Sequence, residues 1–195
     1  RWVPAGATVL ELGPAAGYFT RHLREIGCIV DVVEIDPEAA AQVADLARTV
    51  VVGDLAAPST LDELGGRRYD TIVCADVLEH LTDGTALLAR LCALLAPQGQ
   101  LLLSVPNVAH SAVIAGLLEE HFDYGRVLLL DPMHVRLYTR HSLASALDAA
   151  GCVVDEWDSV VVDLFATEFR TRFEHFRPAI AELLLNRANG AVYQW

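Results

Sequence analysis

Short apolar runs alternate with longer stretches of helical periodicity through the first hundred residues. The runs are rich in Val, Ile and Leu and predict strands at residues 8–12, 29–34, 49–54, 69–75 and 100–105. Between two of them, Phe19, Leu23 and Ile26 recur at helical spacing, and Pro37 marks the start of a second helix. This alternation predicts a doubly wound α/β fold, in which helices cover both faces of a mostly parallel sheet.

The second half of the chain has a less regular pattern. We expect helices at residues 111–121 and 142–151, a sixth strand within 152–164, a helix near 168–187 and a last strand at 191–195. The sequence contains no internal repeat and no low-complexity tract. A length of 195 residues fits one domain, so we expect residues 1–195 to form a single domain.

Composition and charge indicate which kinds of binding partner the protein does not suit. The chain is 53% hydrophobic, which supplies enough apolar material for a large core. Its formal net charge of -12 argues against nucleic acid and anionic membrane surfaces as partners. No apolar run reaches the roughly 18 residues that a membrane-spanning helix needs. The chain starts at Arg1 and ends within an apolar stretch, which leaves open that it is a piece of a longer protein, and the sequence does not indicate an oligomeric state.

The four cysteines are scattered along the chain and include no C-x-x-C pair. They are Cys28, Cys74, Cys92 and Cys152. Each lies in or beside an apolar segment, which predicts buried free thiols. Free thiols fit a reducing compartment and no signal peptide is visible, so we expect a cytoplasmic protein.

A glycine-containing turn follows the first predicted strand. In "LELGPAAG", Glu11, Gly13 and Gly17 lie between the strand and the first helix, where glycine permits a tight turn and close approach to a ligand. Glu34 ends the second strand, where a carboxylate can accept both hydroxyls of a ribose, and Asp54 ends the third. Carboxyl ends of neighbouring strands meet at one edge of the sheet, so this pattern favours a nucleoside-bearing ligand over an ordinary turn.

A dinucleotide-dependent dehydrogenase is the rival interpretation of the same turn. It is less favoured because the turn reads Gly13-Pro14-Ala15-Ala16-Gly17 and lacks the G-x-G-x-x-G pattern.

Five segments within residues 8–107 together resemble the class I S-adenosylmethionine-dependent methyltransferases. They are "VLELGPAAGYFT", "VVEIDP", "GDL", "YDTIVCADVLEHL" and "LLAPQGQLLLSVPN". The first departs from the family pattern at Ala15, where the family has its middle glycine. The resemblance implies a Rossmann-like, seven-stranded, mostly parallel sheet whose last strand is antiparallel, with S-adenosylmethionine as cofactor. It also implies a set of cofactor-binding residues: Glu11, Gly13, Pro14, Gly17, Tyr18, Phe19, Glu34, Ile35, Asp54, Leu55, Ala75 and Asp76.

The segment "CADVLEHL" after the fourth predicted strand carries a candidate metal site. If the chain turns helical at Asp76, then Glu79 and His80 follow at i+3 and i+4 and share its face. Two carboxylates and one imidazole suit Mg²⁺ or Mn²⁺. The D/E-x-x-E-H pattern resembles metal-dependent O-methyltransferases, such as ubiquinone-biosynthesis enzymes and small-RNA 2′-O-methyltransferases, in the latter of which a downstream histidine completes the site. The alternative is a helix start in which these residues only pack or cap.

Two downstream histidines are candidates for that further ligand or for a general base. His134 lies in "DPMHVRLYT", which resembles a segment of bacterial methyltransferases associated with glycan assembly, and Asp131 with Pro132 predicts a turn before it. His110 is the second candidate. Either imidazole could accept the proton of an acceptor hydroxyl if no metal is present.

The sequence therefore favours an enzyme that transfers a methyl group from S-adenosylmethionine to a hydroxyl of a small-molecule or sugar-like acceptor, and it leaves open whether a divalent cation assists. We expect residues 106–141 to be an insertion on the acceptor side. A metal-independent small-molecule O- or N-methyltransferase is the second hypothesis. A non-catalytic S-adenosylmethionine-binding module of a larger protein is a third, from another class.

Overall fold

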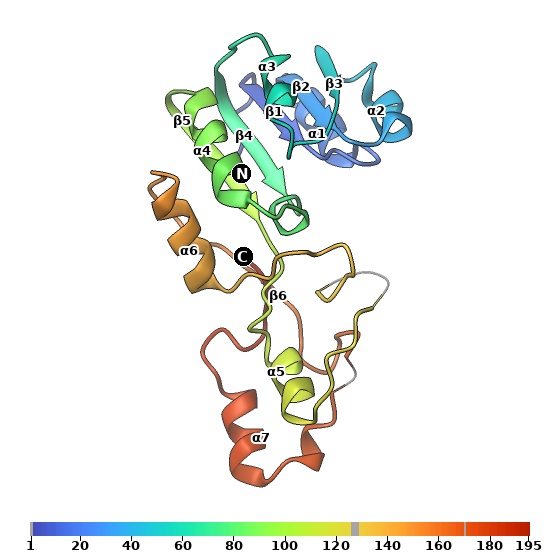
Figure 1. Cartoon of the computed structure of the whole chain (residues 1–195), viewed down its shortest axis with the longest axis vertical. Helices are drawn as coiled ribbons and strands as arrows, with labels where there is room; N and C mark the ends of the chain where they lie inside the picture. The colour runs from blue at the N-terminus through green and yellow to red at the C-terminus, as the bar shows by residue number, and fades with distance from the viewer. Residues whose placement is uncertain (1, 126–128, 170) are drawn as a thin grey trace.

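A five-stranded parallel sheet forms the first half of the protein (Figure 1). The structure is a computed structural model and describes residues 2–125, 129–169 and 171–195. The strand order is β3-β2-β1-β4-β5, and each neighbouring pair is parallel. The strands are β1 (Thr8–Leu12), β2 (Ile29–Glu34), β3 (Thr49–Val52), β4 (Tyr69–Ala75) and β5 (Leu95–Ser104). The predicted mostly parallel sheet is confirmed, with identical bounds for β1, β2 and β4.

Four helices and one 3-10 turn connect these strands. They are α1 (Tyr18–Glu25), α2 (Pro37–Val43), α3 (Pro58–Asp62), η1 (Leu78–His80) and α4 (Gly84–Leu94). The helix starts follow from local chemistry, because the side chains of Asp36 and Asp83 accept hydrogen bonds from the backbone N–H groups of Glu38 and Ala86. Pro37 then occupies the first turn of α2, where its missing N–H costs nothing.

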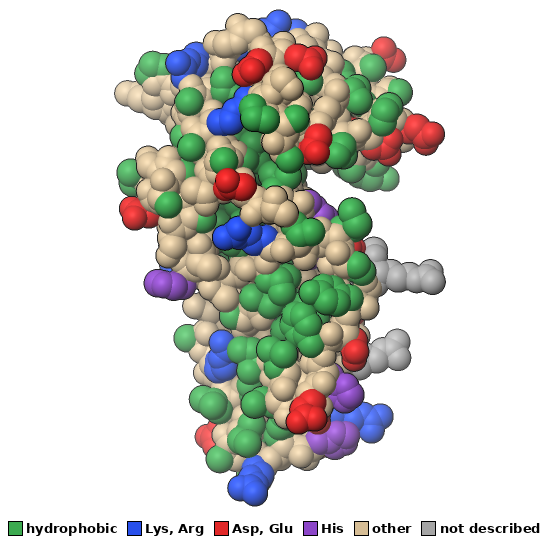
Figure 2. Space-filling view, in the orientation of Figure 1, with side chains coloured by type: hydrophobic (Ala, Val, Ile, Leu, Met, Phe, Trp, Pro, Cys, Tyr) green, Lys and Arg blue, Asp and Glu red, His purple; other side chains and the backbone are tan. Residues whose placement is uncertain are grey.

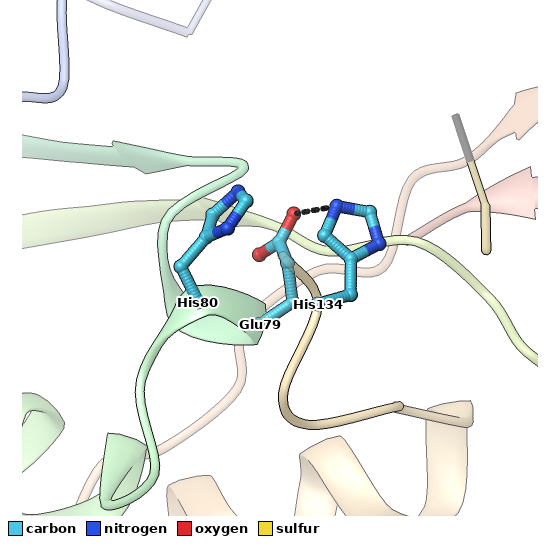
Figure 3. A group of neighbouring side chains, drawn as sticks. All are labelled: Glu79, His80 and His134. Atoms are coloured by element: carbon cyan, nitrogen blue, oxygen red, sulfur yellow. Dashed lines mark ion pairs between the residues drawn. The ribbon is translucent and has the colours of Figure 1, made fainter. Parts of the chain in front are cut away.

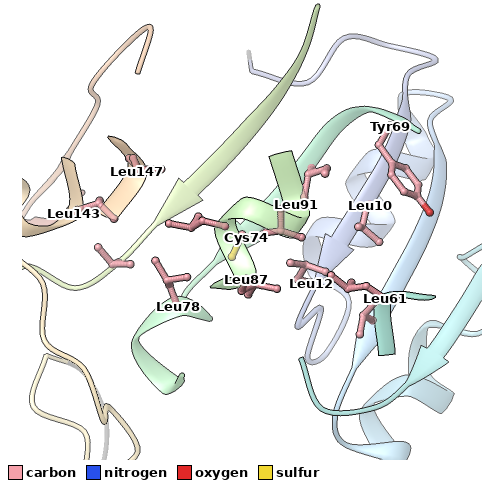
Figure 4. Close-up of a cluster of buried hydrophobic side chains, with 14 of the residues drawn as sticks. Leu10, Leu12, Leu61, Tyr69, Cys74, Leu78, Leu87, Leu91, Leu143 and Leu147 are labelled. Atoms are coloured by element: carbon pink, nitrogen blue, oxygen red, sulfur yellow. The ribbon is translucent and has the colours of Figure 1, made fainter. Parts of the chain in front are cut away.

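The sheet is buried on both faces because successive strand residues point in opposite directions. One face packs against α1 and α2 through Val9, Val32, Leu23 and Val43. The other face carries the larger cluster, in which side chains of β1 and β4 meet α3, α4 and the later helix α6 (Arg140–Ala149) (Figure 4). A strand that is covered on both faces leaves a ligand access only at its ends.

The second half of the chain adds a helical lobe below the sheet, which we define as α5 (Ser111–Leu118), η2 (Phe173–His175) and α7 (Pro178–Leu185) (Figure 1). Ala115, Phe173 and Leu184 of these elements share a small core with Leu164, which lies between β6 and η2. Two further strands, β6 (Val160–Val161) and β7 (Val192–Gln194), pair antiparallel in a sheet of their own. Trp195 and Val105 exchange both backbone hydrogen bonds, so the last residues run antiparallel beside the chain that leaves β5.

Several elements differ from the sequence expectations. The seven strands form a five-stranded and a two-stranded sheet, and the sixth is only two residues long within the predicted 152–164. The helix expected near residues 168–187 is reduced to α7, because Arg177 precedes a proline and takes an extended conformation. Residue 170 of that prediction, and residues 126–128 of the predicted insertion 106–141, lie outside the described residues.

The prediction of four free thiols is wrong for two of the cysteines. Cys92 on α4 and Cys152 after α6 form a disulfide, because these two helices pack against each other. Cys28 and Cys74 are buried free thiols as expected. Because two of the four cysteines form a disulfide, the cysteines no longer favour a reducing compartment. Among the described residues, the structure contains no helix long and apolar enough to cross a membrane.

A buried carboxylate joins three segments at the other end of the sheet. The side chain of Asp31 on β2 is fully buried and accepts two hydrogen bonds from Arg48, of 2.9 and 2.6 Å, and one from the hydroxyl of Tyr69 at 2.9 Å. Burial alone would raise the pKa of Asp31, but the hydrogen bonds from Arg48 and Tyr69 outweigh it and hold the pKa below its ordinary value. The ionised form is therefore part of the folded state.

We expect Asp31→Asn to lower the free energy of unfolding by roughly 3 kcal/mol, because Arg48 and Tyr69 lose the charge that they were arranged around. Since the folded-state pKa is lowered, the contribution of Asp31 is present above its ordinary value of 3.8 and is lost as the pH falls through the folded-state value. Urea unfolding at pH 7 and pH 3 measures both effects. Equal stability of the variant and the wild type at pH 7 would contradict the assignment.

Candidate functional site

The turn between β1 and α1 is built from residues with left-handed backbone angles. Gly13 has φ +64° and donates its N–H to the carbonyl of Val33 at 2.9 Å, which ties the turn to β2. Gly17 has φ +72° and is the N-cap of α1. A Cβ on Gly17 would lie 2.4 Å from Cγ1 of Val43, so the close packing of α1 on α2 requires glycine there. Ala15, at the position of the missing family glycine, takes φ +46°.

Glu34 links this turn to the end of β2. Its Oε2 accepts a hydrogen bond from the N–H of Ala15 at 3.1 Å, and its Oε1 accepts one from the N–H of Asp36 at 3.0 Å. The side chain is buried, so both contacts are shielded from water. Each carboxylate oxygen keeps a further lone pair, which is what the two hydroxyls of a ribose require.

Glu11 lies beneath the same turn on the central strand. It is buried, and its Oε2 has no hydrogen-bond partner in the described part of the chain. Burial raises the pKa of Glu11 to about 7. A cationic group such as the ammonium of an amino acid would satisfy this oxygen, so the residue fits the methionine part of S-adenosylmethionine.

The remaining residues that the resemblance implies lie at the same edge of the sheet. Tyr18 and Ile35 are 85% and 65% exposed, although they directly follow the turn and β2. Large apolar side chains at such positions are available to contact an adenosine. Asp54 accepts a hydrogen bond from the N–H of Ala56 and is exposed after β3. The other positions also follow strand or turn ends: Pro14, Phe19, Leu55 and Ala75.

The chain after β4 does not form the α-helix expected from Asp76. Asp76 has φ +53°, and the 3-10 turn η1 begins only at Leu78. Asp76, Glu79 and His80 therefore do not share one α-helical face, which corrects the geometric basis of the predicted set. The side chain of Asp76 instead accepts a hydrogen bond from Gln194.

Glu79, His80 and His134 come together at the carboxyl end of β4 (Figure 3). Among the described residues, these three form a group whose candidate ligand atoms all lie within 4.8 Å of one another. Nε2 of His134 is 3.9 Å from Oε1 of Glu79, and the two imidazole centroids are 4.9 Å apart. Asp76 and His110, also predicted from the sequence, are not part of this group.

Backbone carbonyls orient both imidazoles of the group. Nδ1 of His80 lies 3.0 Å from the carbonyl oxygen of Met133, and Nδ1 of His134 lies 3.1 Å from that of Leu129. A carbonyl only accepts, so each Nδ1 carries the hydrogen, and each Nε2 keeps a lone pair in the neutral ring. This is the arrangement found for histidines that bind metals.

The carboxylate of Glu79 is buried and lacks hydrogen bonds. Only 1% of the residue is exposed, and neither carboxylate oxygen has a hydrogen-bond partner among the described residues. Burial, together with the negative charge of Asp76, raises the pKa of Glu79 to about 8. Burying a carboxylate without a partner costs free energy, so the ionised form of Glu79 is stabilised by a bound cation, and the neutral form by a proton.

The turn predicted at Asp131 and Pro132 is confirmed, and the side chain of Asp131 accepts a hydrogen bond from the N–H of Met133 at 2.7 Å. Sequence reasoning did not find the contacts that fix the following segment to η1. Arg136 then donates its backbone N–H to the carbonyl of Glu79 at 3.0 Å and its guanidinium to that of Thr82 at 2.8 Å. These contacts hold His134 against Glu79. The outline of the molecule is hollowed between the sheet and the helical lobe, and a histidine borders this hollow (Figure 2).

His110 lies at the start of α5 and outside the group of three. It is fully buried as the N-cap of α5, and its Nδ1 accepts a hydrogen bond from the N–H of Ala112 at 3.2 Å. Burial lowers its pKa. A buried cap whose Nδ1 already holds a backbone N–H is poorly placed to act as a general base on an acceptor.

We expect Gly17→Ala to weaken S-adenosylmethionine binding roughly tenfold or more, because the new Cβ would push α1 away from Val43 and reshape the turn. Gly27→Ala is a matched control. Gly27 also has a left-handed backbone, at φ +82°, but nothing lies within 4 Å of an added Cβ. We expect this control to cost about 1 kcal/mol of stability and leave affinity unchanged. Calorimetric titration compares the two variants, and equal affinities would contradict the role of the turn.

Known proteins share both the sequence pattern and the fold. A family model described as a methyltransferase domain matches residues 2–156. The chain is 28% identical over 176 residues to a ubiquinone biosynthesis O-methyltransferase of Xanthomonas axonopodis pv. citri (strain 306), an alignment that covers 80% of this chain and 70% of that protein.

Two solved structures show a similar fold. A SAM-dependent methyltransferase from Archaeoglobus fulgidus has a TM-score of 0.63 at 17% identity, with 98% of this chain and 85% of that chain covered. Magnesium protoporphyrin IX methyltransferase from Synechocystis PCC 6803, with bound SAH, has a TM-score of 0.59 at 19% identity, with 84% and 70% covered. Because the family model matches more than half of the chain, the protein belongs to the methyltransferase domain family and is a class I S-adenosylmethionine-dependent methyltransferase.

Proposed function

We propose that this methyltransferase acts on a hydroxyl of a small-molecule or sugar-like acceptor, and that Glu79, His80 and His134 bind a divalent cation, Mg²⁺ or Mn²⁺, beside it. The observation that carries the proposal is the buried carboxylate of Glu79 facing Nε2 of His134 at 3.9 Å. The name of the Xanthomonas relative, an O-methyltransferase, supports a hydroxyl acceptor. In this proposal, residues 106–141 line the acceptor-binding side of the site, and His134 is the residue of this segment that reaches the cation.

The electrostatics of the group favour a bound cation. In the neutral ring, Nε2 of His134 presents a lone pair toward an oxygen of Glu79, and two acceptors repel each other at this distance. Without a cation, a proton on Glu79 or on Nε2 of His134 relieves this repulsion, and the raised pKa of Glu79 favours the first. With a cation, the same three side chains become one carboxylate and two imidazole ligands, a mixed donor set that Mn²⁺ accepts readily and Mg²⁺ accepts less well.

The chain contributes binding and orientation to the reaction. The cofactor supplies the methyl group on a sulfonium, and a cation would supply Lewis acidity that lowers the pKa of an acceptor hydroxyl. The glycine turn, Glu11 and Glu34 hold the cofactor, and Asp76 lies at its amino-acid end. His134 and Glu79 place the acceptor hydroxyl for in-line displacement, for which positioning is the main contribution of the protein.

Metal-independent transfer is the second candidate, and one observation favours it. The carbonyl of Leu129 fixes the hydrogen of His134 on Nδ1, which leaves Nε2 free to accept a proton from an O–H or N–H acceptor. In that case His134 acts as the general base, and His80 packs against it. The two candidates differ in whether a cation binds.

We expect one Mn²⁺ to bind per chain, and His80→Ala and Glu79→Gln to weaken that binding at least tenfold, because each removes one ligand. His141→Ala is the matched control, since His141 is exposed on α6. Calorimetry and electron paramagnetic resonance measure the bound ion. Transfer of labelled methyl groups to catechol and sugar hydroxyls, with and without Mn²⁺, measures activity.

Unchanged Mn²⁺ binding in His80→Ala would show that the ion lies elsewhere. Full activity without a divalent cation, combined with a loss of activity in His134→Ala, would favour the general-base candidate. Methylation of amines in place of hydroxyls would overturn the proposed acceptor class.

A further inference from the structure

Asp76 stands between the two parts of the site. It directly follows β4, at the edge of the sheet where the residues proposed to bind the cofactor lie, and it is three residues before Glu79. Burial raises the pKa of Asp76, and its carboxylate is not within the group of three. Its left-handed backbone, at φ +53°, is held by a hydrogen bond from its N–H to the carbonyl of Ser104 at 3.1 Å. The backbone of Asp76 is therefore fixed, but this hydrogen bond does not set the orientation of the side chain.

The side chain of Gln194, 118 residues later in the sequence, holds the Asp76 side chain in one orientation. Its Nε2 donates to Oδ1 of Asp76 and lies 3.1 Å from Oγ of Ser104. Gln194 is itself anchored on two sides, because it pairs with Val160 in the small sheet and bridges to Pro106. The next residue, Trp195, exchanges two hydrogen bonds with Val105. A side chain on so firmly placed a backbone can hold its partner in one orientation.

We propose that Gln194 is a positioning residue, which holds the carboxylate of Asp76 for the cofactor and keeps it out of the cation group. A neutral amide donor occupies one oxygen of Asp76 without adding a charge beside Glu79, His80 and His134. Asp76 thereby serves the amino-acid end of S-adenosylmethionine, and the cation group retains three protein ligands. The inference rests on the proposed function for the place of Asp76 beside the cofactor.

A merely structural role for Gln194 predicts something different. The amide of Gln100 makes a comparable pair of contacts on β5, with the carbonyl of Trp2 at 2.6 Å and with Oγ1 of Thr71 at 3.4 Å. Thr71 lies four residues before Ala75, the last residue of β4, so these contacts are remote from the carboxyl ends that form the site. If Gln194 only joins strands, its loss affects stability as the loss of Gln100 does and leaves cofactor affinity unchanged.

Three variants of the full chain separate these roles: Gln194→Leu, Gln194→Glu and the matched control Gln100→Leu. We expect Gln194→Leu to weaken S-adenosylmethionine binding about tenfold, since it removes a hydrogen bond to a charged group. We expect a larger loss in Gln194→Glu, because two carboxylates would then face each other. Gln100→Leu should bind the cofactor within twofold of the wild type. Calorimetry measures affinity, and thermal unfolding confirms that each variant is folded.

Cofactor affinity in both Gln194 variants within twofold of the wild type would overturn the inference, as would an equal loss in Gln100→Leu. Gln194→Glu keeps the shape of the side chain and decides the matter alone if the Leu variant does not fold. Mn²⁺ titration reports separately on the proposed function. If no variant and no wild-type chain binds Mn²⁺ while the Gln194 variants still lose cofactor affinity, the cation site fails and the role of Gln194 stands.

Discussion

The coverage of the sheet on both faces is the constraint on which the rest of the structure depends. Val9 and Leu10 on β1 are both fully buried although they point in opposite directions. No polar ligand can reach the middle of such a strand, so the chemistry collects at the carboxyl ends, where turns expose backbone N–H groups and side chains. Glu34, Asp54 and Asp76 each end or follow a strand there. The residues proposed to bind the cofactor and the group of Glu79, His80 and His134 therefore lie at the same edge of the sheet.

Local patterns in the sequence predict the parts of this arrangement that depend on nearby residues. The bounds of β1, β2 and β4 follow from short apolar runs, and the left-handed turn follows from Gly13 and Gly17. The proximity of Glu79 and His80 follows from adjacency alone. His134 could be proposed because its segment carries a recognisable pattern. For the strands, the turn and the pair of Glu79 and His80, the deciding interaction is within one element or its flanking turn, whereas His134 rests on the resemblance of its segment to known methyltransferases.

The parts that sequence reasoning missed depend on contacts between distant segments. No local signal marks Gln194, which meets Asp76 from 118 residues away. The disulfide between Cys92 and Cys152 requires α4 and α6 to be neighbours, which scattered cysteines do not reveal. The helix expected from Asp76 fails because that residue adopts a left-handed backbone, held by the carbonyl of Ser104 on β5. His110 looked chemically active in the sequence because its capping contact is visible only in the structure.

The imidazoles of His80 and His134 take their orientation from the main-chain oxygens of Met133 and Leu129, and not from side chains. Every amino acid has such an oxygen, so the exposed position 133 can change identity without altering which ring nitrogen of His80 is presented, whereas the side chain of Leu129 is buried and is constrained by packing. Met133 is 67% exposed beside the group, and its side chain takes no part in orienting His80. The surface beside His80 can thus change its side chains while the orientation of the imidazole is kept.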